Sequence, residues 1–483
     1  MSESADDRGS GVGLRGGTHE KRGRIMNTNT MIRRACFIAM GVAACVLAAL
    51  IFRNRYLSGY DIKETFPNEE FRGYVMDMFD LNGDGKLSRK EADDVKEINI
   101  MLSMDPDNTL QGIEIFRNLE ILECYDSSLR ELDVSGNRKL KELYCTSNEL
   151  VTLNLRNNTN LETLYCGMNQ LEELDLSGCD KLTIAECYDN KIARLKLRGC
   201  DSLESLDCSR NCLEALDMKL PALKELYCTD NRLSGIDITL FPSLMVLSCG
   251  YNQLTELDLS KANDQFMMLE CSENRIEKLI LWSDSRVEAS GVMCAGNLLT
   301  ELDLSSLQNL YSLNCSDNQL TELYVGDKRL LDALECSGNR LTKLDLSNCR
   351  QLATLCCGNN PMSAVDLGNC NKLHWLDVRN LGLTELNLSN LRELQYLYCS
   401  GNQLTELNLK SIEALIQLDC SDNQLTELEV NLARESGYNR TEIHCRGNRI
   451  DVIRTNIEPS KLECDSNTKL IAAVSGNGEE EPR

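Results

Sequence analysis

The chain has 483 residues, a formal net charge of −24, 42% hydrophobic residues and 24 cysteines. Nucleic acids and anionic membrane surfaces bind through positive potential, so this acidic balance excludes both as expected partners. The length would allow two or three globular domains, but a repeat described below makes most of the chain one elongated body.

The N-terminal 34 residues are polar and rich in glycine and arginine, which predicts a disordered basic arm over residues 1–34. Met26 and Met31 are alternative starts of the natural chain. Residues 35–52 then run without a charged side chain. This length predicts a transmembrane helix that acts as a signal anchor. The basic flank places the N-terminus inside, so the anchor is single-pass and everything after it is extracellular.

Two other fates of this segment stay open. A cleaved signal peptide would make the protein secreted. The run Val42-Ala43-Ala44-Cys45 resembles a lipoprotein box, although apolar residues continue after Cys45. We favour the uncleaved anchor because Arg53 and Arg55 follow the apolar run and no small-x-small cleavage site ends it.

A linker over residues 53–66 leads to a motif that predicts a helical cap over residues 67–100. Residues 80–91 fit the twelve-residue EF-hand loop, with Gly85 at its sharp turn. The oxygen ligands expected for calcium are the side chains of Asp80, Asn82 and Asp84, the backbone carbonyl of Lys86, Ser88 through water, and a bidentate Glu91. The alternative is a loop that keeps the turn but holds no ion.

The remainder repeats about every 21 residues, as in residues 310–323. A cysteine recurs in register from Cys124 to Cys464, and only Val378 interrupts this column. Three residues after it stands an asparagine in fifteen of seventeen coils, with Ser127 and Leu381 as exceptions. A unit this short cannot bury its own leucines, so we expect about 17 stacked coils of parallel strands over residues 101–475. Residues 476–483 form a polar tail.

The pattern LxxLxCxxNxLxxLDLxx resembles the IRREKO class of bacterial leucine-rich repeats, and the EF-hand segment resembles the helical cap of internalins. The resemblance implies a leucine-rich repeat solenoid with a small α-helical EF-hand cap and one transmembrane helix. Whether the LxxLDL half of each coil forms a second strand or an irregular arc stays open.

The cysteine column faces inward, where the thiols act as small hydrophobes. Stacked cysteines lie about 4.8 Å apart and point the same way, which does not suit a disulfide. Two pairs outside the column are 21 residues apart and leave a disulfide open: Cys179 with Cys200, and Cys349 with Cys370.

We expect no enzyme, because the three histidines are dispersed and no phosphate loop or zinc spacing occurs. The outward strand positions carry acids and tyrosines. Two aromatic groups stand out: Tyr125, Tyr144, Tyr165 and Tyr188 near the start, then Trp375, Tyr396 and Tyr398 beside Arg379 and the departure from the column at Val378. Tyrosine suits any exposed strand, so these residues need no partner.

The functional interpretation is that Trp375, Tyr396, Tyr398 and Arg379, with Tyr144 and Tyr165, bind a protein or glycan at the cell surface. The alternative is a structural or adhesive spacer of the cell envelope without a specific partner. We expect a monomer.

Overall fold

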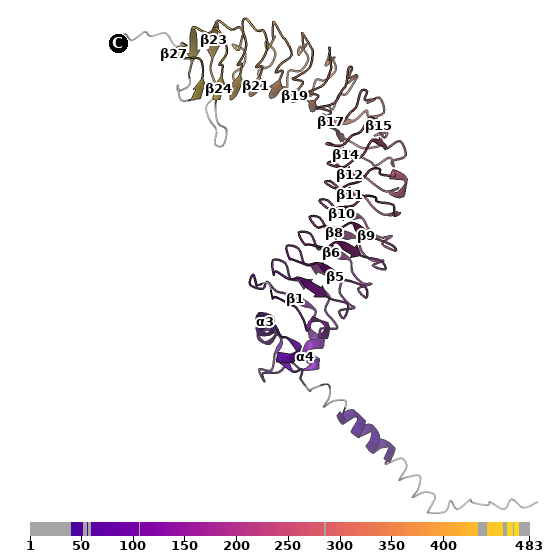
Figure 1. Ribbon diagram of the computed structural model, residues 1–483. Coiled ribbons are helices and arrows are strands. Elements are labelled where there is room, and N and C mark those ends of the chain that lie inside the picture. The colour runs from indigo at the N-terminus through magenta and orange to yellow at the C-terminus, as the bar shows by residue number, and fades with distance from the viewer. Residues whose placement is uncertain are drawn as a thin grey trace, which may run out of the picture. The chain divides into compact units, whose positions relative to one another are not determined.

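The computed structural model describes residues 40–51, 56, 59–105, 107–284, 286–432, 442–456, 461–466 and 468–472. Contacts divide the chain into two compact units, Met1–Tyr60 with Ser88–Lys90, and Asp61–Leu87 with Glu91–Arg483. The second unit contains the repeats and most of the predicted cap (Figure 1).

In the first unit, residues 40–51 are helical and exposed. The predicted membrane span also includes residues 35–39 and 52, which lie outside the described residues, as does the predicted arm. Within the described part of the chain, no helix is both long and apolar enough to cross a bilayer.

From residue 61 to the first coil, the described residues form three short helices: α2 (Ile62–Thr65), α3 (Glu69–Phe79) and α4 (Arg89–Asp94). Side chains cap two of them, because Asp61 accepts hydrogen bonds from the first backbone N–H groups of α2 and Asn68 accepts one from Phe71. Helix α2 lies in the stretch expected to be a linker, so helical structure begins before residue 67.

An aromatic cluster joins the cap to the first coil. Phe66 packs edge-on against Phe71 at 5.3 Å between ring centroids and stacks on Phe116 of the first coil at 6.0 Å. Gly112 has φ +102°, and a Cβ there would lie 2.5 Å from Phe66 Cδ1. The glycine therefore lets the Phe66 ring approach the backbone closely.

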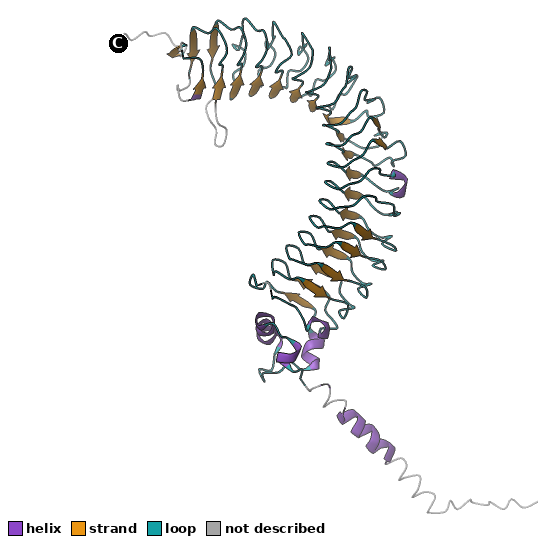
Figure 2. Ribbon diagram, in the orientation of Figure 1, coloured by secondary structure: helices purple, strands orange, loops and turns teal. Residues whose placement is uncertain are grey.

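The repeats form one parallel 18-stranded sheet, in which each coil contributes one strand and strands pair in chain order (Figure 2). Its first nine strands are β1 (Glu97–Asn99), β2 (Ile121–Glu123), β4 (Glu142–Tyr144), β6 (Thr163–Tyr165), β8 (Ile184–Glu186), β10 (Ser205–Asp207), β11 (Glu225–Tyr227), β12 (Val246–Ser248) and β14 (Met268–Glu270). Its last nine are β16 (Ser290–Met293), β17 (Leu310–Asn314), β18 (Ala333–Glu335), β19 (Thr354–Cys356), β20 (Trp375–Asp377), β21 (Tyr396–Tyr398), β22 (Gln417–Asp419), β24 (Glu442–His444) and β26 (Leu462–Glu463). The predicted parallel solenoid is confirmed.

The second half of the coil forms a strand in some coils and an irregular segment in others. The outer strands pair in four small parallel sheets: β3 (Glu131–Asp133) with β5 (Thr152–Asn154); β7 (Glu173–Asp175) with β9 (Arg194–Lys196); β13 (Glu256–Asp258) with β15 (Lys278–Ile280); and β23 (Glu427–Val430) with β25 (Val452–Thr455) and β27 (Lys469–Ala472). Two 3-10 turns also occur in the repeat region, at Ile113–Ile115 and Ile238–Leu240. Both readings of the LxxLDL half therefore occur in one chain.

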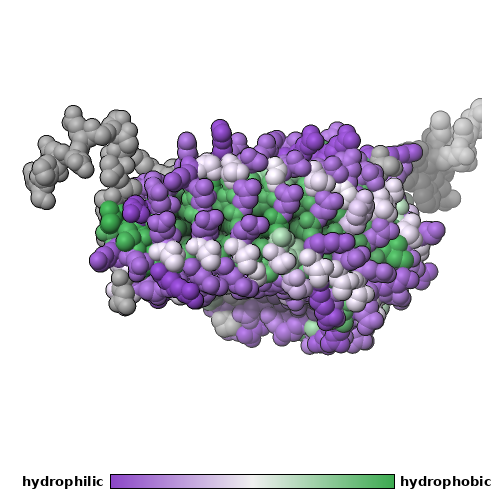
Figure 3. All heavy atoms as spheres, turned by 90° about the horizontal axis from the view of Figure 1, so that it is seen from above, coloured by the Kyte–Doolittle hydropathy of each residue, from purple (hydrophilic) through white to green (hydrophobic). Residues whose placement is uncertain are grey.

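The core lies inside the coil, between the long sheet and the outer segments. Leucines of the long sheet, such as Leu313 and Leu334, are fully buried, whereas Leu302 and Leu344 of the outer segments keep 8% and 9% exposure. In the view from above, an apolar band lies between rows of hydrophilic side chains (Figure 3). Other outer leucines, such as Leu174 and Leu259, are fully buried, so both halves of the coil contribute to the core.

The cysteine column is continuous at the end of the inner strands. The N–H of Cys124 donates to the carbonyl of Tyr144 at 2.8 Å, and the same bond recurs in later coils, with Val378 taking the cysteine's place. All described cysteines are free, including Cys179 and Cys200. The Cys200 thiol instead lies 3.3 Å from the carbonyl oxygen of Leu176.

Candidate functional site

The EF-hand-like loop is held by its own side chains. Asp80 accepts hydrogen bonds from the backbone N–H groups of Gly83, Asp84 and Gly85 at 2.8–3.2 Å. Asn82 Nδ2 lies 3.0 Å from Glu91 Oε1, so the first and last parts of the loop meet. Positive φ angles at Gly83 and Gly85 allow the turn.

The donor set of this loop suits a hard cation. Asp80, Asn82, Asp84 and Glu91 offer carboxylate and amide oxygens, which calcium prefers, and the loop is largely exposed. Ser88 belongs to the first unit, where it forms an antiparallel bridge with Gly59. Over the described residues, no group of three His, Cys, Asp or Glu side chains is already placed to hold a metal ion.

The later aromatic group forms one cluster on strands β20 and β21. The ring centroid of Trp375 lies 4.8 Å from that of Tyr396 and 5.1 Å from that of Tyr398. The two strands pair in register, Trp375 opposite Tyr396 and Asp377 opposite Tyr398, which brings residues 21 positions apart into contact. We call Trp375, Tyr396, Tyr398 and Arg379 the aromatic cluster.

Arg379 braces this cluster through an ion pair. Its guanidinium binds Asp377 with both Nε and Nη2, at 3.0 and 2.6 Å, and lies 5.5 Å from the Tyr398 ring centroid. The hydrogen bond to Asp377 raises the pKa of Arg379, and burial raises the pKa of Tyr398. The cation therefore stays charged and fixed against the ring.

Two neighbours of the cluster, Cys356 and Gly358, were not among the predicted site residues. Cys356 lies opposite Asp377 on the preceding strand. Burial raises the pKa of Cys356 to about 12. A Cβ on Gly358 would lie 3.0 Å from the Asp377 carboxylate, so glycine leaves room for the ion pair. Aligning the outward positions of adjacent coils would have found both residues.

The earlier tyrosine group is only partly assembled. Tyr144 and Tyr165 stack with ring centroids 5.1 Å apart and planes 9° apart. A hydrogen bond from Tyr144 to Glu142 raises the Tyr144 pKa to about 12. Tyr125 and Tyr188 do not join this stack, because they follow the cysteine column at the turn; the Tyr188 ring instead lies over Gly167.

The two described histidines are each paired with carboxylates. His374 Nε2 lies 3.5 Å from Glu393, and His444 Nδ1 lies 3.1 Å from Glu463. His19 lies outside the described residues.

Comparisons with known proteins agree with this architecture. The Leucine Rich Repeat family model matches residues 393–415. The functional domain of InlJ from Listeria monocytogenes, which includes a cysteine ladder, is 29% identical with a TM-score of 0.64; the match covers 77% of this chain and 78% of that one. A search of curated protein sequences found no match.

Two further solved structures share the fold alone. YopM from Yersinia enterocolitica is 24% identical, with a TM-score of 0.58 over 83% of this chain and 95% of that one. The internalin InlF from Listeria monocytogenes is 19% identical, with a TM-score of 0.55 over 74% and 97%. The solenoid is thus a leucine-rich repeat fold. The chain resembles bacterial leucine-rich repeat proteins of the internalin and YopM type.

Proposed function

We propose that this protein is a membrane-anchored, calcium-binding leucine-rich repeat protein that binds a protein or glycan partner at the cell surface. The observation that carries the proposal is the aromatic cluster. Trp375 is 36% exposed, and Tyr396 and Tyr398 are partly exposed, on a sheet whose other outward side chains are mostly small or acidic.

The geometry of the cluster favours binding over a purely structural role. Three rings in contact present a rigid apolar surface that loses little conformational entropy when it is covered. Tyr398 keeps a polar tip, whose hydroxyl lies 3.1 Å from Gln417 Oε1. Arg379 holds its guanidinium 5.5 Å from the centroid of the Tyr398 ring. Aromatic stacking with nearby polar groups suits a protein surface or a sugar ring.

The proposed membrane anchor rests on the sequence. The uncharged run of residues 35–52 follows Arg33 and Arg34, so translocation would carry the solenoid outside the cell.

The proposed calcium site lies in the cap. Asp80, Asn82, Asp84 and Glu91 would hold the ion by their side chains and Lys86 by its carbonyl, with Ser88 contributing through water. When bound, calcium would hold the oxygen ligands from both ends of the loop around one ion. Because Leu87 lies within the loop and is fully buried, a fixed loop would also hold that side chain in the cap core.

The test of partner binding is the double variant Trp375→Ala with Tyr398→Ala. Full-length protein in detergent is screened against a glycan array and a display library of extracellular protein domains. We expect a ligand selected by the wild type to lose about tenfold or more in affinity, since buried aromatic anchors each contribute about 2 kcal/mol or more.

The matched control is Tyr251→Ala with Tyr311→Ala, which removes two exposed tyrosines, 60% and 49% accessible, outside the cluster. The control should keep its affinity, and both variants should keep the wild-type melting temperature. Unchanged affinity in the cluster variant would remove this site, and a screen without any ligand would favour the envelope spacer.

A further inference from the structure

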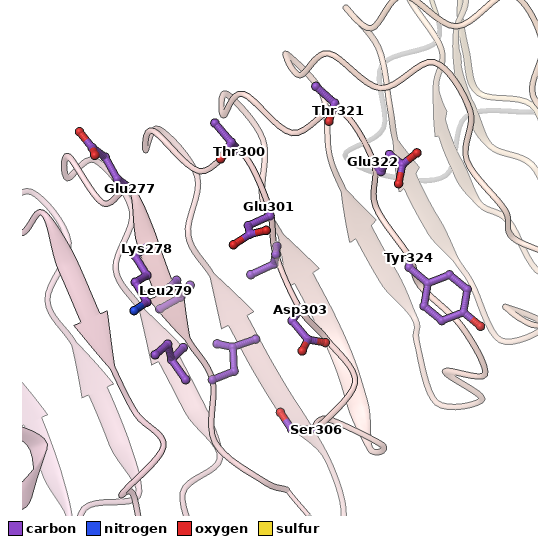
Figure 4. Close-up of a pocket in the computed structure, with 13 residues that line it drawn as sticks. Glu277, Lys278, Leu279, Thr300, Glu301, Asp303, Ser306, Thr321, Glu322 and Tyr324 are labelled. Atoms are coloured by element: carbon purple, nitrogen blue, oxygen red, sulfur yellow. The ribbon is translucent and has the colours of Figure 1, made fainter.

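The outer face of the solenoid has a groove where one of the small outer sheets ends. Strand β15 pairs with β13 on one side only. On its other side lie residues 300–304, which also run along the coil (Figure 4). In the described structure, no backbone hydrogen bond joins these residues to β15. The backbone edge of β15 is therefore free to pair.

The groove is built by a longer coil. From Cys271 to Cys294 the step is 23 residues instead of 21. The longer coil places Trp282 in the core, where its ring centroid lies 4.6 Å from that of Phe266. The fully buried Asp284 accepts hydrogen bonds from the backbone N–H groups of Gln308 and Asn309, both at 2.7 Å. These contacts hold the next coil in place, so the gap is a fixed feature.

The groove has an apolar floor and acidic walls. Its volume of about 690 Å³ is within the range of ligand sites. Leu279 and Leu302 form the floor, at 9% and 8% exposure. Four carboxylates and one lysine line the walls, giving a net charge of −3 (four negative, one positive): Glu277, Glu301, Asp303, Glu322 and Lys278.

The charged side chains of this groove have no ion-pair partners, although the Asp303 carboxylate accepts a hydrogen bond from the backbone N–H of Ser305 at 2.8 Å. No ion pair among the described residues involves any of the five side chains. The groove beside β23 is smaller, about 240 Å³, and two of its three acids are paired with bases, so its net charge is only −1 (three negative, two positive). There Lys410 lies 4.0 Å from Glu429, and Arg454 lies 3.8 Å from Glu427. Of these two grooves, only the one beside β15 combines a free strand edge with several carboxylates that form no ion pair.

We propose that the groove beside β15 binds an extended basic peptide segment of a partner protein by adding it as a strand to the edge of β15. Main-chain hydrogen bonds supply affinity in this mode, and alternate side chains supply selectivity. Inward side chains of the peptide contact Leu279 and Leu302, so they are apolar. Outward side chains face Glu301 and Asp303, so they are basic. The recognised sequence therefore alternates basic and apolar residues.

The probe is an acetylated, amidated peptide of alternating lysine and valine, titrated into the full-length protein in detergent. We compare the wild type with Glu301→Lys/Glu322→Lys. Both glutamates are exposed, so their replacement leaves the core intact. We expect about a tenfold loss of affinity, because each charge reversal removes an attraction and adds a repulsion.

The control is Glu256→Lys/Glu385→Lys, which makes the same change at the same position of the L-T-E-L unit in coils outside the groove. Its affinity should stay within about twofold of the wild type. If the control loses as much as the groove variant, the peptide binds the acidic surface in general, and the proposal is wrong.

Two further measurements test strand addition itself. A peptide N-methylated at alternate residues keeps its charge but cannot donate those backbone hydrogen bonds, so it should bind at least tenfold more weakly. The unmethylated peptide should slow hydrogen exchange of amides in Lys278–Ile280. Equal binding of the methylated peptide, or unchanged exchange in β15, overturns the proposal.

Discussion

At the scale of single residues, each coil depends on its asparagine. Asn318 accepts a hydrogen bond from Leu299 N–H at 3.0 Å and donates to the carbonyls of Cys294 and Cys315 at 3.0 and 3.2 Å. One amide thus satisfies buried backbone groups of two adjacent coils. The sequence-based prediction that this column serves the backbone of the turn is confirmed.

We expect Asn318→Ala to lower the free energy of unfolding by about 1–3 kcal/mol, because it leaves buried backbone groups unpaired. The measurement is urea denaturation followed by circular dichroism. Asn348→Ala, at an exposed position of a later coil, is the control and should change stability by less than about 0.5 kcal/mol. Similar values for the two variants would mean that water replaces the amide.

At the scale of elements, the cap and the outer segments differ in how far sequence could predict them. The loop of residues 80–91 is a local motif, so spacing alone identifies its ligands. The predicted start of the cap at residue 67 left out Phe66, which joins the cap through ring contacts with Phe71 and Phe116. The contact between Phe66 and Phe116 joins residues 50 positions apart, so no local sequence pattern indicates it.

Calcium should stabilise the cap. With free ion tenfold above its dissociation constant, binding adds about 1.4 kcal/mol. We expect a melting temperature that rises with calcium, falls with chelator and no longer responds in Glu91→Gln, which removes the bidentate carboxylate. Glu97→Gln in β1 is the control and should respond like the wild type. A melting curve that ignores chelator in the wild type would leave the loop as an empty turn.

At the scale of the whole molecule, the stacked thiols make stability depend on pH. Burial raises the pKa of Cys124 and of Cys294 to about 12. In the unfolded chain thiols ionise near pH 8.5. Below that pH both states are protonated and the contribution of the column is complete. As pH rises from about 8.5 toward 12, the unfolded state loses protons first, so stability falls.

We therefore expect cooperative alkaline unfolding, with each buried thiol contributing up to about 1.4 kcal/mol per pH unit. Cys294→Val copies the natural replacement at Val378 and should make the dependence on pH shallower. The exposed Cys45→Val is the control and should leave the slope unchanged. Denaturant midpoints between pH 8 and 11 provide the measurement. Equal slopes in both variants would contradict a role for thiol ionisation.

The register of the repeats predicts some of the aromatic contacts in the candidate site and not others. Because adjacent coils lie in register, numbering by coils correctly predicted that Trp375, Tyr396 and Tyr398 would meet. The same numbering placed Tyr125 and Tyr188 on the coils next to Tyr144 and Tyr165, but only Tyr144 and Tyr165 stack. Positions just after the strand enter a turn, where side chains no longer stand in one row.

The amino-acid pattern was enough to predict the parallel coil, its column of thiols and asparagines, and the outward residues of each strand. Every coil carries the same pattern of residues, and a unit of this length can bury its leucines only by stacking on its neighbours. These features can therefore be predicted from any single coil. The pairing of the outer segments and the free edge of β15 could not be predicted and became visible only in the folded structure. The spacing of those segments depends on coil lengths and core side chains such as Trp282, whose effects cross from one coil to the next.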